Sequence, residues 1–170
     1  MRKLGVVWGI GGIAAILLYA ALSLGRYTLE AVEGGLTATE WLALIATSVF
    51  MAWAEGYRGF QQRFSPRVAA RALHLYREPT LARLVFAPLF CTGYFGATRR
   101  LRLTIWIGTV LIVGAVAFFN RIPQPWRGIL DSGVLVGLCW GTVTLLASTW
   151  VAFREGRAPV AAEVSPAPGL

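Results

Sequence analysis

Long stretches without a charged residue set the class of fold that this chain can adopt. Residues 4–24 and 132–153 contain no charged side chain. As an α-helix, each run is long enough to cross a hydrocarbon core about 30 Å thick. Residues 103–119 form a third such run. The chain is 56% hydrophobic and only 14% charged, which leaves too little polar surface for a soluble globule of 170 residues. The sequence therefore predicts an all-α integral membrane protein.

A further span is predicted after the first run. Residues 25–36 are expected to form an outer loop, and Thr37 and Glu40 then have the spacing of a capping box, which marks the start of a helix. The uncharged part of this helix, residues 41–54, is too short to cross alone. The helix must therefore continue through Glu55 and Tyr57. We expect four transmembrane helices, over about residues 4–24, 38–57, 103–119 and 132–153.

Basic residues are concentrated between the second and third spans. Nine of the 16 lysines and arginines lie there, and all nine are arginines: Arg58, Arg63, Arg67, Arg71, Arg77, Arg83, Arg99, Arg100 and Arg102. In a four-span arrangement 13 basic residues fall on this side of the membrane and three on the other. Because loops rich in lysine and arginine stay in the cytoplasm, both termini should be cytoplasmic. The expected location is the bacterial inner (plasma) membrane.

Residues 58–102 are predicted to form a basic cytoplasmic segment that is interfacial or re-entrant. Ser65 and Pro66 are a preferred N-cap and first helical residue, so a new helix should begin there and end before Pro79. Its arginines recur at helical spacing, which is typical of a helix lying in the membrane surface. Residues 80–98 are apolar but interrupted by proline and glycine. We expect a bent interfacial or re-entrant segment, with a fifth span as the alternative. Residues 1–157 would form a single membrane domain, followed by a disordered tail of residues 158–170.

The arginines of this segment are the candidate contacts for a partner. Aromatic residues lie between them, which is what an interfacial segment needs, so anionic membrane lipids are the expected partners. An acidic protein partner is the alternative, and nucleic acid is not expected because headgroups are the nearer polyanion. The candidate contacts are Arg63, Arg67, Arg71, Arg77, Arg99, Arg100 and Arg102.

Two acids lie near the ends of predicted spans. Glu55 and Arg58 are three residues apart and could form an ion pair at the inner interface. Asp131 is expected in the first turn of the last span, where an acid complements the helix dipole. Each acid also has a functional interpretation, as a proton or cation site at the mouth of a helix bundle.

Gly133, Gly137 and Gly141 place two successive GxxxG steps on one face of the last span. Such a face lets another helix backbone approach closely. The expected partner is the first span of the same chain, through Gly5, Gly9 and Gly12. A homo-oligomer interface is the alternative.

No residue pattern indicates catalysis, a cofactor or a metal. His74 is the single histidine, and Cys91 and Cys139 form no metal-ligand spacing. The predicted span interiors carry no ionisable residue of the kind that transporters use. We therefore expect a non-enzymatic accessory or scaffold subunit. The alternatives are a small oligomeric channel or transporter, and a membrane enzyme that acts on a lipid headgroup.

Overall fold

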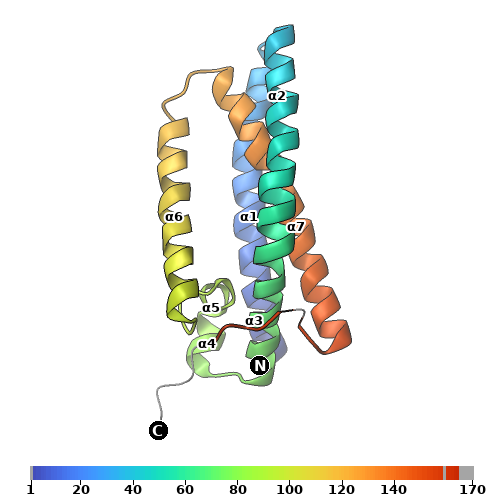
Figure 1. Ribbon diagram of the computed structural model, residues 1–170, viewed down its shortest axis with the longest axis vertical. Helices are drawn as coiled ribbons and strands as arrows, with labels where there is room; N and C mark the ends of the chain where they lie inside the picture. The colour runs from blue at the N-terminus through green and yellow to red at the C-terminus, as the bar shows by residue number, and fades with distance from the viewer. Residues whose placement is uncertain (1, 159, 165–170) are drawn as a thin grey trace. The chain divides into compact units, whose positions relative to one another are not determined.

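The computed structural model describes residues 2–158 and 160–164, and the fold over these residues is all-α (Figure 1). In chain order the helices are α1 (Arg2–Glu33), α2 (Ala38–Met51), the π-helix η1 (Ala52–Phe64), α3 (Ser65–Arg77), α4 (Leu81–Val85), α5 (Ala87–Thr92), α6 (Arg99–Phe119) and α7 (Trp126–Glu155). Three of them, α1, α6 and α7, are long and apolar enough to cross a membrane. They coincide with three of the predicted spans and suggest a multi-pass membrane protein.

The ends of these helices differ from the predicted ends. The helix α1 continues to Glu33, so most of the predicted outer loop is helical. The helix α7 begins at Trp126, several residues before the predicted start of the last span. The reason is that an uncharged run marks only the part of a helix that fits the hydrocarbon. The same helix can carry charged residues where it continues beyond that layer.

The start of α2 is the predicted one. Glu40 N donates to the Thr37 hydroxyl at 3.4 Å, and Thr37 N donates to Glu40 Oε2 at 2.8 Å, which confirms the capping box. The predicted second span falls on α2 and η1 together. The predicted α-helix from Ser65 and Pro66 that ends before Pro79 is confirmed as α3, but its predicted Ser65 N-cap is wrong, because Phe64 has helical dihedral angles (φ −73°, ψ −56°) and Ser65 is itself helical. The proline at 66 is tolerated because it lies in the first turn of α3, where the hydrogen-bond pattern changes from π to α.

The chain divides into two compact units. Unit 1 consists of Met1–Ala14, Phe64–Leu111 and Leu145–Leu170, and unit 2 of Ala15–Arg63 and Ile112–Thr144. In unit 1 the helix α3 packs against α5. It is buried around most of its circumference rather than along one stripe, with alanines at 69, 70 and 72 that allow close approach. This burial differs from the predicted surface helix.

Residues 80–98 form the two short helices α4 and α5 of unit 1, with 5 and 6 residues. Neither is long enough to span a membrane, so the structure gives no support to a fifth span. Pro88 lies in the first turn of α5, and Gly93 ends that helix with a φ of +97° that other residues rarely adopt. Gly5, Gly9 and Gly12 of α1 face these helices. A β-carbon at Gly12 would lie 2.9 Å from Pro88 Cγ.

The tail contacts the rest of unit 1 where the structure describes it. Thr98 N donates to Glu163 O at 3.1 Å, and Ala97 and Val164 form an antiparallel β-bridge. In Figure 1 this segment crosses α3. The disorder expected for residues 158–170 stays a prediction, and the structure adds that residues 162–164 contact unit 1. A segment of this composition cannot form a core, but its main-chain groups can bind to unit 1. The rest of the predicted tail, residues 159 and 165–170, lies outside the described residues.

Candidate functional site

The arginines predicted to contact lipid differ in burial. Five have exposed side chains: Arg63, Arg77, Arg99, Arg100 and Arg102. Arg67 is half-buried, and Arg71 is buried with only 1% of its surface exposed. The exposed members can reach a charged surface, whereas Arg71 cannot.

Three of the exposed arginines lie at the start of α6 in unit 1. Arg99 and Arg100 are its first two residues, Arg102 follows in the same turn, and this turn contains no acidic residue. Cations at a helix N-terminus are disfavoured by the helix dipole, by about 0.3–1 kcal/mol each. An anion bound there would offset both the dipole and the clustered charge. The arrangement is thus suited to phosphate groups.

Arg71 is bound by main-chain oxygens of unit 1. Its Nε donates to Phe90 O at 2.7 Å and its Nη2 to Phe95 O at 2.8 Å. Its Nη1 donates to Ala162 O at 3.0 Å and to Glu163 O at 3.3 Å. The guanidinium also lies over the Phe90 ring, with Cζ 4.3 Å from the ring centroid. Arg71 therefore holds α3, the α5 region and the tail together.

Burial shifts the ionisation of the groups around Arg71. It lowers the pKa of Arg71 to about 10, so the side chain remains charged at neutral pH. Burial raises the pKa of the neighbouring Cys91 thiol to about 12, against an opposing effect of the Arg71 charge. Burial also lowers the pKa of His74, which lies 3.2 Å from Arg83 Nη1. The Cys91 thiol is consequently protonated near neutral pH, and Arg71 keeps its charge.

The structural role of Arg71 was not found by sequence reasoning. Arg71 has the same helical spacing as its neighbours Arg67 and His74, and this spacing predicts that all three lie on the exposed side of a surface helix. The available signal was local, because Ala69, Ala70 and Ala72 surround it and predict close packing on all sides of the helix.

Glu55 and Arg58 in unit 2 do not form the predicted ion pair in the described part of the chain. Arg58 lies over the Trp53 ring instead, with Cζ 5.0 Å from its centroid. Among the described residues the buried Oε2 of Glu55 has no hydrogen-bond partner. A β-carbon at Gly137 would lie only 2.8 Å from this oxygen. The carboxyl group is therefore packed against the glycine face of α7.

Asp131 is buried, with 2% exposed, and lies deeper in α7 than predicted because this helix begins at Trp126. The early start is held by Gln124, whose Oε1 accepts from Gly128 N at 3.0 Å. The partner of Asp131 is Arg127, one turn earlier, with Nε 3.6 Å from Oδ2. The Arg127 guanidinium also lies over the Tyr27 ring, with Cζ 3.4 Å from the ring centroid. The predicted role at a helix end is thus replaced by an ion pair along the helix.

The glycine face of α7 packs within unit 2, but not against the predicted partner. A β-carbon at Gly133 would lie 2.9 Å from Thr47 Cγ2, and one at Gly141 would lie 2.5 Å from Phe60 Cγ. Ser48 and Ser132 extend the contact with a hydrogen bond of 3.2 Å. The partners of this face are therefore α2 and η1, whereas Gly5, Gly9 and Gly12 of α1 face α4 and α5.

Within residues 2–158 and 160–164, no cluster of three or more histidine, cysteine, aspartate or glutamate side chains could hold a metal ion. The chain was also compared with protein-family models, with curated proteins and with solved structures, and none of them matches. Functional inference therefore depends on the geometry of the two units.

Proposed function

We propose that this protein is a non-enzymatic, four-span membrane protein, an accessory or scaffold subunit whose exposed cytoplasmic arginines bind anionic lipid headgroups. The fourth crossing is α2 with η1, since the uncharged residues 41–54 lie within helical backbone that continues to Arg77. Both termini are cytoplasmic, in a bacterial inner membrane, because 13 of the 16 basic residues then lie inside.

The observation that supports this function is the group Arg99, Arg100 and Arg102 at the start of α6. These side chains are exposed in a helical turn that also concentrates the positive end of the helix dipole. In the proposed topology this turn faces the cytoplasmic leaflet, whose anionic lipids attract each nearby arginine by about 1 kcal/mol.

Lipid preference tests the proposal directly. Purified full-length protein in detergent is titrated with short-chain phosphatidylglycerol and, separately, phosphatidylcholine. We expect tighter binding of the anionic lipid, with a preference that decreases as salt screens the charges. Replacing Arg99, Arg100 and Arg102 with glutamine should reduce this preference. The control replaces Arg26 and Arg121, which lie outside in the proposed topology. Equal binding of the two lipids at low salt would refute the proposal.

Single-cysteine labelling tests the topology. With Cys91 and Cys139 replaced by serine, cysteines are introduced at the exposed positions Glu78, Arg154, Gly34 and Arg121. An impermeant maleimide added to right-side-out cells should label positions 34 and 121 only. Labelling at 154 but not at 78 would indicate an odd number of crossings between them and would contradict four spans.

A channel or transporter is a second candidate, favoured by Glu55. Its buried Oε2 has no hydrogen-bond partner among the described residues, and it lies in a π-helix, a rare element that often occurs at functional sites. Proton or cation flux into proteoliposomes that is abolished by Glu55→Gln, but not by Glu33→Gln, would support this candidate. Absence of flux in the unmodified protein would argue against it.

A further inference from the structure

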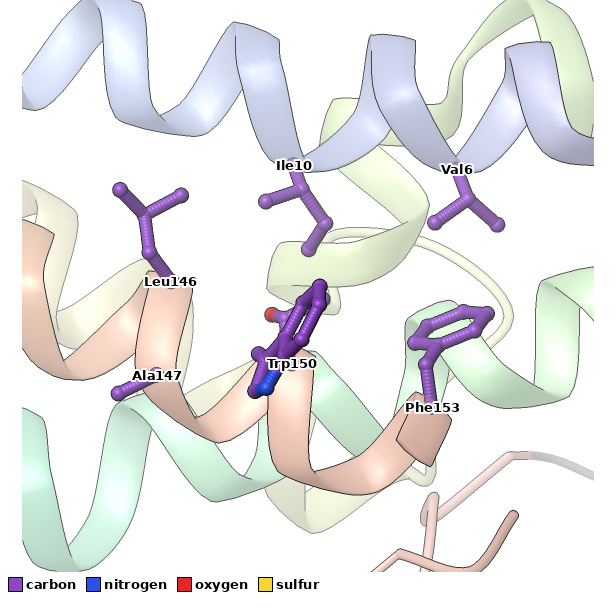
Figure 2. Close-up of a pocket in the computed structure, with 7 residues that line it drawn as sticks. Val6, Ile10, Leu146, Ala147, Trp150 and Phe153 are labelled. Carbon is purple, nitrogen blue, oxygen red and sulfur yellow. The ribbon is translucent and has the colours of Figure 1, made fainter. Parts of the chain in front are cut away.

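An apolar groove lies between α1 and α7 within unit 1 (Figure 2). Its volume is about 530 Å³, which is within the range of about 300–1,000 Å³ found for small-molecule sites. Val6 and Ile10 form one wall, and Leu146, Trp150 and Phe153 contribute to the other. The hydroxyl of Thr149, which also lines the groove, already donates to Leu145 O at 2.8 Å. The groove therefore offers apolar contact and no unpaired hydroxyl donor.

The direction of the two helices places basic residues at one end of this groove. Figure 2 shows Val6 opposite Phe153 at one end, and Leu146 toward the other. Arg2 lies four residues before Val6, and Arg154 lies four residues after Trp150, so each is on the groove-facing side of its helix, about one turn further on. Both arginines are therefore beyond the Val6–Phe153 end, and Lys3 follows Arg2 in sequence.

These cations have no acidic partner in the described part of the chain. The ion pairs found there involve His74, Arg127 and Arg157, and both Arg2 and Arg154 are exposed. An apolar channel that ends at two or three exposed cations is complementary to an amphiphile with an anionic head.

We propose that unit 1 binds one anionic phospholipid, with an acyl chain in the α1–α7 groove and its phosphate between Arg2, Lys3 and Arg154. This inference rests on the proposed function, because the cytoplasmic position of both basic ends places them at the depth of the inner-leaflet phosphates. A helical peptide would leave the basic end without a defined counter-charge. A free phosphate ion would leave the groove unfilled. A phospholipid uses both features.

This site differs from the arginine layer in stoichiometry and in what it recognises. The exposed arginines of α6 can attract several headgroups by charge alone. The groove instead holds one chain, against a wall that includes the ring of Trp150. Binding at the groove should therefore depend on shape as well as charge.

Native mass spectrometry of the full-length protein, released from detergent with long-chain phosphatidylglycerol, tests the proposal. We expect a one-to-one complex that persists at salt concentrations which remove the other bound lipids. Arg2→Gln with Arg154→Gln should weaken it at least tenfold. Ala147→Phe, which fills the groove without changing charge, should also weaken it at least tenfold. Arg99→Gln with Arg100→Gln removes the same charge elsewhere and should leave the one-to-one complex intact.

The outcomes separate this site from the proposed function. If the arginine pair of α6 matters as much as Arg2 and Arg154, or if Ala147→Phe has no effect while the variant melts at the same temperature, the groove site is refuted. Equally tight binding of phosphatidylcholine or of a free fatty acid would also refute it. Loss of salt-sensitive lipid preference with the one-to-one complex intact would instead refute the arginine layer alone.

Discussion

The two units bury charged side chains in opposite ways. In unit 1 the Arg71 guanidinium donates to four main-chain oxygens. In unit 2 the buried Glu55 Oε2 and Asp131 Oδ2 accept no hydrogen bond within the described residues, and Asp131 has only the more distant Arg127 at 3.6 Å. The difference lies in which main-chain groups are within reach of each charge.

Free main-chain groups occur where the chain leaves a regular helix. Phe90 lies in the last turn of α5, Phe95 lies in the bend that follows, and Ala162 and Glu163 are outside any helix. Their oxygens can accept from an arginine, those of Phe90 and Glu163 in addition to the N–H groups of Gly93 and Thr98. A carboxylate needs free N–H groups instead, and inside η1 and α7 the helices use nearly all of these themselves. The comparison teaches that a helical protein can bury a charged side chain where irregular segments of the chain supply its hydrogen-bond partners.

The largest expected effect is at Arg71. Arg71→Leu removes four hydrogen bonds, two of them to the oxygens of Phe95 and Ala162, and should lower the free energy of unfolding by about 3 kcal/mol or more, since each hydrogen bond to a charged group contributes about 1.5–3 kcal/mol. Arg71→Lys keeps the charge but loses the planar arrangement of donors, and should be intermediate. Thermal unfolding in one detergent measures both. If Arg71→Leu were as stable as the unmodified protein, the hydrogen bonds of Arg71 would not stabilise unit 1, and the contrast with unit 2 would be wrong.

A smaller loss is expected at the glycine face of unit 2. Gly137→Leu places a branched side chain where Glu55 lies, and overpacking of this kind costs about 1–3 kcal/mol. Gly114→Leu in α6 is the matched control, because a β-carbon there would meet nothing within 4 Å. The two variants are compared by unfolding temperature and by size in detergent. A well-folded Gly137→Leu monomer from a protein that otherwise self-associates would show that this face also forms an oligomer.

Glu55→Gln should change stability by less than about 1 kcal/mol, and in the stabilising direction. A buried carboxylate without a donor is more costly than a neutral amide of the same shape. The corresponding change in unit 1, Arg71→Gln, should be clearly destabilising. Measuring both in the same detergent sharpens the contrast between the units. A large loss at Glu55 would reveal a bonded or functional carboxylate.

The smallest expected effect concerns Cys91 and involves no loss of stability. Because burial raises the pKa of this thiol to about 12, little thiolate is present near neutral pH. In a Cys139→Ser background, alkylation should therefore be slow and should accelerate only as the pH rises toward 12. Adding Arg71→Leu should open unit 1, return the thiol toward its ordinary pKa and speed labelling near pH 8. Rapid labelling of the folded parent would contradict this burial.

The parts of the fold that sequence predicted depend on local signals. Uncharged runs identify α1, α6 and α7 because a membrane excludes charge over a fixed length. The capping box at Thr37 and Glu40 specifies a start that no distant contact alters. Ser65 and Pro66 mark the start of α3, but Ser65 is not a cap, because the preceding residues already form the helix η1 and leave no free end to cap.

The candidate site was less predictable because it depends on which segments meet. The glycines of α7 were identified as a packing face, yet their partners on α2 and η1 could not be chosen over α1 from spacing alone. Arg71 binds oxygens of Ala162 and Glu163, 91 and 92 residues away in sequence. Every residue has a main-chain oxygen, so the sequence does not indicate which of these oxygens accept from Arg71.

Arg71 is synthesised well before Ala162 and Glu163, whose oxygens accept its hydrogen bonds. At about 5–20 residues per second, the ribosome adds Ala162 and Glu163 roughly 5–20 s after Arg71. Until then the guanidinium must keep water as a partner, and this part of unit 1 cannot close around it. A chain cut short before residue 162 retains an incompletely paired arginine in its interior. Unit 1 can therefore close completely around Arg71 only after residues 162 and 163 have been translated.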